Sequence, residues 1–274
     1  HAAELAVKAG SDMDMESYIY LAELKSLIEN GHVAIEQIDD AVRRILTIKF
    51  ELGLFDDPFH YCDTTREQEI TGSPEIREGA LEMAKKSIVL LKNAEATLPL
   101  KKEGQTIALI GPLASDKNSP LGNWRIAGDN NSAVSVLEGM LKYGGNTLIH
   151  ERGVKLVNEI PAFHKEVDIN TTDRSGIKAA KIAAKNADVV VMVLGEYGFQ
   201  SGEGRSRSKL DLPGLQQELL EEIYAINTNI ILVLMNGRPL VLNWADEHLP
   251  AIIEAWHLGT ESGNAIAQVL YGEY

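Results

Sequence analysis

In the second half of the chain, short runs of apolar residues alternate with longer amphipathic stretches. The runs are mostly β-branched and lack polar alternation, which is typical of strands covered on both faces in a largely parallel sheet. We expect such strands at residues 106–111, 146–151, 188–195, 229–235 and 251–257. Helical stretches at 175–186 and 215–227 separate some of them, so the sequence predicts βαβ units and an α/β class fold, a three-layer α/β sandwich.

The first 55 residues have helical spacing instead. One apolar stripe ends at Asn30-Gly31, a typical helix end, and is formed by Leu21, Leu24, Leu27 and Ile28. A second helix is expected from about residue 35 to 52, with a buried face of Ile38, Ala41, Val42, Ile45 and Ile48. Two helices, with one short strand at most, cannot enclose a core. We therefore expect this region to pack against another part of the protein.

A polar stretch containing Pro and Gly, residues 56–74, predicts a surface linker with Cys62 in an exposed loop. A helix is then expected from Pro74 to about residue 93, since Pro favours the first helical position. Its apolar face would hold Ala80, Met83, Ala84, Ile88 and Leu91. The predicted organisation is a first region (1–55), a linker (56–74) and an α/β domain (75–274).

Charge and composition exclude several classes of function. The chain has 26 Lys and Arg against 40 Asp and Glu, a net charge of −14, which repels the phosphate backbone of nucleic acids. Its single cysteine excludes an internal disulfide framework. No apolar run approaches the roughly 20 residues that span a bilayer, and the start lacks a signal-peptide pattern. The first residues, HAAELAVKAG, resemble the middle of a helix, so we expect a piece of a longer protein.

Ligands of parallel sheets bind beyond the carboxyl ends of the strands. After the first predicted strand, the turn GPLASDK lacks the G-x-G-x-x-G pattern of dinucleotide sites, and Pro112 removes a backbone donor. Nucleotide binding is therefore disfavoured. Trp124 follows in a loop between Gly122 and Gly128. It could stack on the apolar face of a sugar or be an ordinary core tryptophan, and the sequence does not decide between them.

The loop of residues 195–214, GEYGFQSGEGRSRSKLDLPG, is long and polar, as functional loops often are. It holds Glu196, Glu203 and the cations Arg205, Arg207 and Lys209. Glu203 lies between two glycines, which allow the backbone to project it and to approach a ligand closely. On composition alone, Glu203 is best interpreted as a solvated loop carboxylate.

The other strand ends favour structure over chemistry. Arg238 lies in an Asn-Gly turn and could bind a carboxylate, but this is also ordinary loop chemistry. The glycines around Thr260 and Glu261 are typical of a helix start. The histidines show no metal-ligand spacing, and no G-x-S-x-G elbow is present. We expect no cofactor and no metal.

Six collinear segments nevertheless resemble family 3 glycoside hydrolases, in particular bacterial periplasmic β-glucosidases. They are AGSDMDM (9–15), RRILTIKFELGLFDDP (43–58), SIVLLKNAEATLPLKK (87–102), IALIGPLA (107–114), VLMNGRPL (233–240) and EAWHLGTESGNAIAQVLYGEY (254–274). Together they cover essentially the whole chain.

The resemblance implies a fragment: the end of a (β/α)8-type barrel domain (1–55) followed by the α/β sandwich domain. It implies a retaining exo-acting β-glycosidase that hydrolyses terminal β-D-glucosyl residues of β-linked gluco-oligosaccharides or aryl β-glucosides, periplasmic or secreted. The Asp nucleophile of the family precedes the segment matching AGSDMDM, so this chain lacks it and is expected to be inactive alone. Its partner would be the missing part of the barrel, with no nucleic acid and no membrane.

The resemblance also implies residue roles. Matching the G-E at the strand end and the later L-D-L-P places the general acid/base on Glu203, with Glu196 structural. The implied substrate-binding residues are Trp124, Asp12, Met15 and Arg205. Some family members use a His-Asp pair of the barrel instead of this glutamate. Two alternatives to an enzyme remain open at this point: a non-catalytic carbohydrate-binding module and a structural α/β module.

Overall fold

The computed structural model describes residues 1–125, 128–162 and 165–274. These divide into two compact units, His1–Thr71 and Gly72–Tyr274, each of which is described by itself. The division falls within the stretch predicted as a linker, close to its expected end.

The first unit contains helices α1 (Ala2–Lys8), α2 (Ile19–Glu29), α3 (Ile35–Glu51) and α4 (Thr64–Ile70). Its small core is built from Ala3, Val7, Leu27 and Val33, with Leu24 and Ile28 packed against it. The predicted stripe of α2 is therefore correct for its last three members. Leu21 is 85% exposed, although its neighbours Ile19 and Tyr20 in the first turn of α2 pack against this core.

The prediction of a buried face on α3 is wrong for this unit. None of its residues is buried, and Val42 and Ile48 are 46% and 58% exposed. Only Ile38, near the start of α3, packs against the small core. The amphipathic pattern correctly predicts a helix, but within this unit most of its apolar face is left without a buried contact.

The predicted linker is partly helical. Asp63 begins α4 as its N-cap, with its carboxylate accepting hydrogen bonds from the backbone N–H groups of Thr65 and Arg66, both at 3.0 Å. An aspartate before Thr-Thr-Arg-Glu was thus a helix-start signal that the polar composition concealed. Cys62 is exposed, as predicted.

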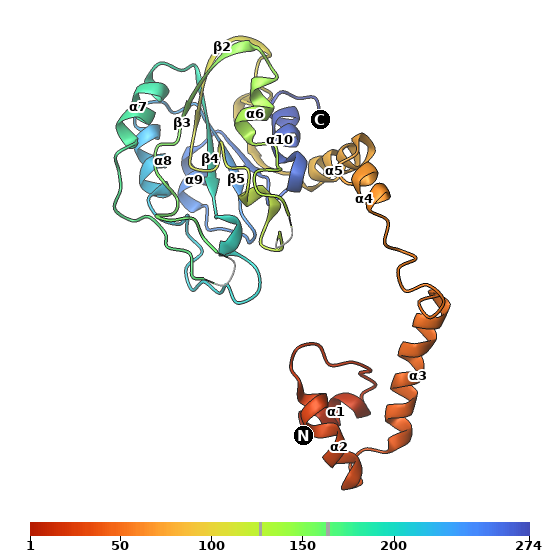
Figure 1. The fold of residues 1–274 in the computed structure, drawn as a ribbon. Coiled ribbons are helices and arrows are strands. Elements are labelled where there is room, and N and C mark those ends of the chain that lie inside the picture. Colours follow the sequence, from red (N-terminus) through yellow and green to blue (C-terminus); the bar gives the residue numbers. More distant parts are fainter. Residues whose placement is uncertain (126–127, 163–164) are drawn as a thin grey trace. The chain divides into compact units, whose positions relative to one another are not determined.

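The second unit contains one six-stranded sheet in the order β1-β6-β5-β4-β2-β3 (Figure 1). All neighbouring strands are parallel except β1, which pairs antiparallel with β6. The bounds are β1 Val89–Asn93, β2 Glu103–Ile110, β3 Gly145–Glu151, β4 Val189–Gly195, β5 Ile230–Met235 and β6 Ala251–Glu254. Every residue of β4, β5 and β6 is buried. Each of the predicted runs corresponds to one of β2 to β6.

The expected long helix from Pro74 is correct as far as Ser87 and wrong beyond it. Helix α5 (Pro74–Ser87) ends before Ile88, and the next residues form β1 (Val89–Asn93) instead. Ile88 and Leu91 therefore do not lie on a helical face. Pairing with β6 at the edge of the sheet is the tertiary contact that overrides the helical pattern.

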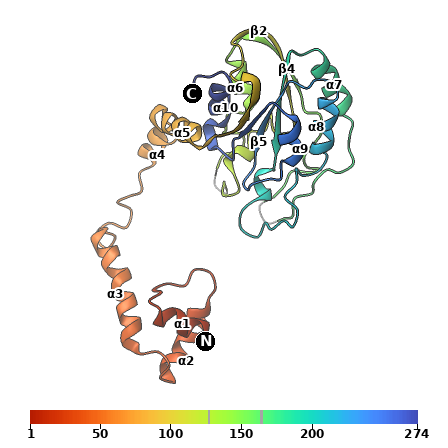
Figure 2. The ribbon, with the colours of Figure 1, turned by 180° about the vertical axis from the view of Figure 1, so that it is seen from behind.

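Helices cover both faces of the sheet, as seen from opposite sides in Figures 1 and 2. One buried cluster includes side chains of α5, α6 (Val136–Leu141) and α10 (Ser262–Leu270). The other includes side chains of α7 (Ile177–Lys185), α8 (Gln216–Tyr224) and α9 (Asn243–His248). The unit is thus the predicted three-layer α/β sandwich. In the part of the chain that the structure describes, no helix is long and apolar enough to cross a membrane.

Candidate active site

The strand order places a topological switch point between β2 and β4. From β2 the chain continues to β3 on one side, whereas from β4 it continues to β5 on the other. In open parallel sheets, ligands bind in the crevice outside the carboxyl ends of the two strands at such a point. The loop after β2 carries Trp124 and the loop after β4 carries Glu203, so both candidates follow strands of the switch point.

These two loops lie in direct contact. The backbone N–H of Gly198 donates to Ser119 Oγ at 3.1 Å. A Cβ atom on Gly202 would lie only 2.0 Å from Asn123 Nδ2, so the loops meet closely beside both candidate residues. Arg125 places its guanidinium 4.8 Å from the centre of the Phe199 ring, a second contact across the same boundary.

Glu203 is exposed at the tip of its loop. Its flanking residues Gly202 and Gly204 have φ of +107° and +68°, in the region that favours glycine. Among the described residues, no hydrogen bond or ion pair to the Glu203 carboxylate is present. The two glycines thus give the tip a conformation in which Glu203 is exposed.

The two glycines are expected to differ in their tolerance of substitution. Gly202→Ala should displace the tip, because the new Cβ would overlap Asn123, whereas the Cβ of Gly204→Ala would meet nothing within 4 Å. Both variants carry the cost of a positive φ, about 1 kcal/mol. We expect a loss of unfolding free energy about 1–3 kcal/mol larger for Gly202→Ala, measured by chemical denaturation. Equal losses would show that the contact with Asn123 does not constrain the tip.

Glu196 follows β4 directly and is fully buried. Its carboxylate forms ion pairs with Arg207, at 2.7 Å, and with Arg238, at 3.1 Å. The N–H of Gly237 also points at it, at 3.4 Å. Glu196 is therefore enclosed by donors, which is the environment of a structural carboxylate, and it is not exposed to a substrate.

Two arginines, Arg207 and Arg238, surround Glu196 and also donate to backbone carbonyls. Arg207 binds Glu196 and donates to the backbone carbonyl of Asp211 at 2.8 Å. Arg205 is partly buried, and its backbone carbonyl accepts a hydrogen bond from Arg238 at 2.9 Å. The sequence did not decide whether Arg238 binds a carboxylate. In the structure it binds that of Glu196.

Trp124 is 65% exposed, so it is not a core tryptophan. It lies beside the Glu203 loop, because its neighbour Asn123 packs closely against Gly202.

Asp12 and Met15 belong to the first unit. The guanidinium of Arg44 binds the Asp12 carboxylate with three hydrogen bonds of 2.7–3.0 Å and holds the pKa of Asp12 below its ordinary value. Asp12 lines a cavity of about 430 Å³ together with Tyr18 and Tyr20. Met15 is 85% exposed and is not among the residues that line it.

Glu254, the last residue of β6, is a buried carboxylate that sequence reasoning missed; it is 4% exposed. It accepts hydrogen bonds from the N–H of Trp256 at 3.0 Å and from Asn236 Nδ2 at 3.1 Å. Burial raises its pKa to about 7, and the nearby charge of Glu196 acts in the same direction. The available signal was a charged residue at the end of an otherwise apolar run.

This carboxyl group is expected to make stability depend on pH. Its pKa lies near 7 in the folded state, against an ordinary value of 4.5, so the folded state retains a proton that the unfolded chain has released. Its contribution is therefore fully present below pH 4.5 and is lost as the pH rises to about 7. The loss should be on the order of 3 kcal/mol.

Urea denaturation at pH 5 and pH 8, followed by tryptophan fluorescence, measures this effect. All 3 tryptophans lie in the second unit, so the signal reports on that unit. Glu254→Gln should remove most of the difference in unfolding free energy between pH 5 and pH 8. The same pH dependence in both proteins would contradict the assignment.

No group of three or more His, Cys, Asp or Glu side chains that could hold a metal ion occurs within residues 1–125, 128–162 and 165–274.

Comparison with known proteins gives a consistent family. Residues 88–274 match the model of the glycosyl hydrolase family 3 C-terminal domain. The whole chain is 39% identical to the periplasmic β-glucosidase of Salmonella typhimurium and covers 37% of its length. It is also 39% identical to a β-xylosidase of Formosa agariphila, over 99% of this chain and 38% of that protein.

Solved structures agree. The β-glucosidase of Listeria innocua in complex with isofagomine superposes with a TM-score of 0.84 and 33% identity, over 100% of this chain and 36% of that one. The same enzyme has been solved with glucose, at a TM-score of 0.83 over 99% of this chain and 35% of that one. The chain therefore spans little more than a third of the length of the relatives it matches.

Proposed function

Because the chain belongs to glycosyl hydrolase family 3, we propose that it forms part of a retaining exo-β-glycosidase in which Glu203 is the general acid/base. The observation that carries this proposal is an exposed carboxylate, on a tip flanked by two glycines, beside the switch point of the sheet. Arg207 and Arg238 do not oppose the role, since both are bound to Glu196.

In the proposed reaction, a carboxylate nucleophile attacks the anomeric carbon while the glycosidic bond breaks and Glu203 protonates the departing oxygen. Water then attacks the anomeric carbon of the glycosyl-enzyme, Glu203 accepts its proton, and the bond to the nucleophile breaks. Two inversions give net retention. The nucleophile and Glu203 carboxyl groups must lie about 5–5.5 Å apart in such enzymes.

We assign the nucleophile to a part of the protein outside these 274 residues. The aspartates of the AGSDMDM segment are poor substitutes. Asp12 is paired with Arg44, and Asp14 accepts from Ser17 Oγ at 2.5 Å and from the N–H of Tyr20 at 3.2 Å. Residues 1–55 would then be the end of a (β/α)8-type barrel domain. The uncovered apolar face of α3 supports this assignment, since a barrel helix packs its apolar face on other parts of the barrel.

The proposed substrates are β-linked gluco-oligosaccharides or aryl β-glucosides with a terminal β-D-glucosyl residue. Relatives include a β-glucosidase and a β-xylosidase, and an enzyme solved with glucose. Trp124 would stack on the aglycone side of the substrate, since an exposed indole beside the acid/base loop suits a sugar or aryl ring. Asp12, Met15 and Arg205 are the further proposed binding residues, and the proposed location is the periplasm or the exterior.

The chain alone is expected to give no hydrolysis of an aryl β-glucoside above the uncatalysed rate, because it supplies only one of the two carboxyl groups. The whole protein should hydrolyse the same substrate and release the β-anomer first, as followed by proton NMR. Robust turnover by the chain alone would contradict the assignment of the nucleophile. Initial release of the α-anomer would contradict retention.

A further inference from the structure

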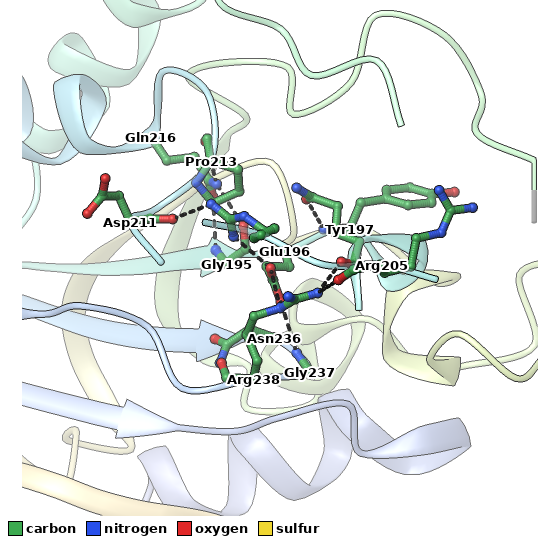
Figure 3. A network of polar contacts seen from close by, with 12 residues as sticks. Gly195, Glu196, Tyr197, Arg205, Asp211, Pro213, Gln216, Asn236, Gly237 and Arg238 are labelled. Carbon is green, nitrogen blue, oxygen red and sulfur yellow. Dashed lines mark hydrogen bonds and ion pairs between the residues drawn. The ribbon is translucent and has the colours of Figure 1, made fainter. Parts of the chain in front are cut away.

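We infer that the buried ion pair of Arg238 with Glu196 positions Glu203 for proton transfer. This inference rests on the proposed function of Glu203. Glu196 is fully buried and the Arg238 side chain is only 18% exposed, so both act as positioning residues; Figure 3 shows their polar contacts.

The guanidinium of Arg238 is hydrogen-bonded to the backbone on both sides of the tip; these two stretches of backbone are its limbs. Nη2 of Arg238 donates to the backbone carbonyl of Gln200 and, at 2.9 Å, to that of Arg205. These two residues bracket the segment that carries Glu203 between its two glycines. Because glycines with positive φ give the tip little stiffness of its own, its position depends on what holds the two limbs.

The guanidinium of Arg238 is itself held in place by the buried carboxylate of Glu196. Its Nε lies 3.1 Å from Glu196 Oε1 and 3.3 Å from Oε2, and the Arg238 side chain is only 18% exposed. Charge-assisted hydrogen bonds in such a protected site are strong and directional. The Arg238 backbone carbonyl also accepts from Asn236 Nδ2, at 2.8 Å.

Glu196 is equally fixed, because it follows the end of β4. The buried amide of Gln216 accepts from the N–H of Gly195, at 2.9 Å, and donates to its carbonyl, at 2.7 Å. The ends of β4 and β5 are neighbours in the sheet, with Gly195 opposite Met235. The connection therefore runs from the sheet through Glu196 and Arg238 to the two limbs of the tip.

Arg207 provides a matched comparison. It pairs with the same Glu196 carboxylate and has a similarly protected side chain, at 20% exposed against 18% for Arg238. Its other hydrogen bond goes to the carbonyl of Asp211, beyond the tip. Replacing Arg207 with lysine therefore keeps a cation beside Glu196 and leaves in place both Arg238 hydrogen bonds, to the carbonyls of Gln200 and Arg205.

The expected consequence concerns proton transfer. A general acid must lie within about 2.6–3.2 Å of the oxygen that it protonates. A misplacement of about 1 Å can cost on the order of 10²-fold in rate. Releasing the tip should thus slow the cleavage of substrates that need protonation and spare those that do not.

The test compares Arg238→Lys, Arg207→Lys and Glu203→Ala in the whole protein. For each variant, kcat/KM is measured on β-glucosides with a poor and with a good leaving group, together with the melting temperature. Lysine keeps the charge beside Glu196 but lacks the planar guanidinium, whose Nε binds Glu196 while its Nη2 reaches both carbonyls. We expect Arg238→Lys to lose about 10- to 100-fold on the poor substrate, less than about threefold on the good one, and Arg207→Lys to change little on either.

Equal effects of the two lysine variants, or equal losses of Arg238→Lys on both substrates, would overturn the inference. If Arg238→Lys does not fold, Arg238→Gln takes its place, since its amide can still donate to one carbonyl. The Glu203→Ala variant separates this inference from the proposed function. A loss that does not depend on the leaving group in that variant refutes the role of Glu203 and the inference with it.

Discussion

Replacing Glu203 with alanine in the whole protein is expected to slow the hydrolysis of a β-glucoside with a poor leaving group by about 10²- to 10⁴-fold. The departing oxygen of such a substrate cannot leave without a proton, and the variant has no donor at that position. A substrate whose leaving group is already a weak base should form the glycosyl-enzyme nearly as fast as before. The measurement is kcat/KM on the two substrates, which reports the first chemical step.

The matched control is Glu247→Ala, an exposed glutamate of α9 that makes no ion pair among the described residues. It removes the same charge from the same unit and should change neither rate constant. Wild-type rates of Glu203→Ala on both substrates would place the acid elsewhere, in the His-Asp manner of some relatives, and would reduce the loop to a structural or sugar-binding element.

Replacing Glu196 with alanine is expected to lower the unfolding free energy of the second unit by about 3–5 kcal/mol. The carboxylate is fully buried and balances two guanidinium groups, at 2.7 and 3.1 Å. Removing it leaves Arg207 and Arg238 with unpaired charges in a largely protected site. The cost is the desolvation of those charges more than the loss of the pair itself.

Glu218→Ala is the comparison for this effect. Glu218 forms an equally short ion pair with Arg174, at 2.7 Å, but their side chains are 39% and 51% exposed. Such a pair contributes about 1 kcal/mol or less, because water solvates both charges when the pair is broken. Urea denaturation followed by tryptophan fluorescence measures both variants. Similar losses of unfolding free energy for the two variants would show that the contribution of Glu196 to stability does not depend on its burial.

The strands of the sheet could be predicted because parallel strands are covered on both faces. Their sequences are therefore continuous apolar runs, as in Val189–Gly195 and Ile230–Met235, where every residue is buried. Strand β1 escaped prediction because it follows α5 without a break residue and most of it is exposed at the edge. The short helices α6 and α9, of 6 residues each, have too few turns to show a period.

Part of the candidate site was visible in the sequence and part was not. The glycines beside Glu203 are a local signal, and the structure gives both of them positive φ. The hydrogen bonds of Arg238 to residues of the Glu203 loop depend on β4 and β5 being neighbours, and no local pattern records strand order. The buried state of Glu254 likewise follows from its place in the sheet. For α3 the helical period correctly predicts the helix, but it does not show whether the apolar face is covered.

The most direct test of the central claim is azide rescue of Glu203→Ala in the whole protein, with an aryl β-glucoside that has a good leaving group. This substrate forms the glycosyl-enzyme without acid catalysis, and azide, an anion with no proton to lose, attacks the anomeric carbon without a base. The account predicts faster turnover with azide and a β-glucosyl azide product, detected by NMR. Unchanged turnover, with glucose as the sole product, would contradict Glu203 as the acid/base.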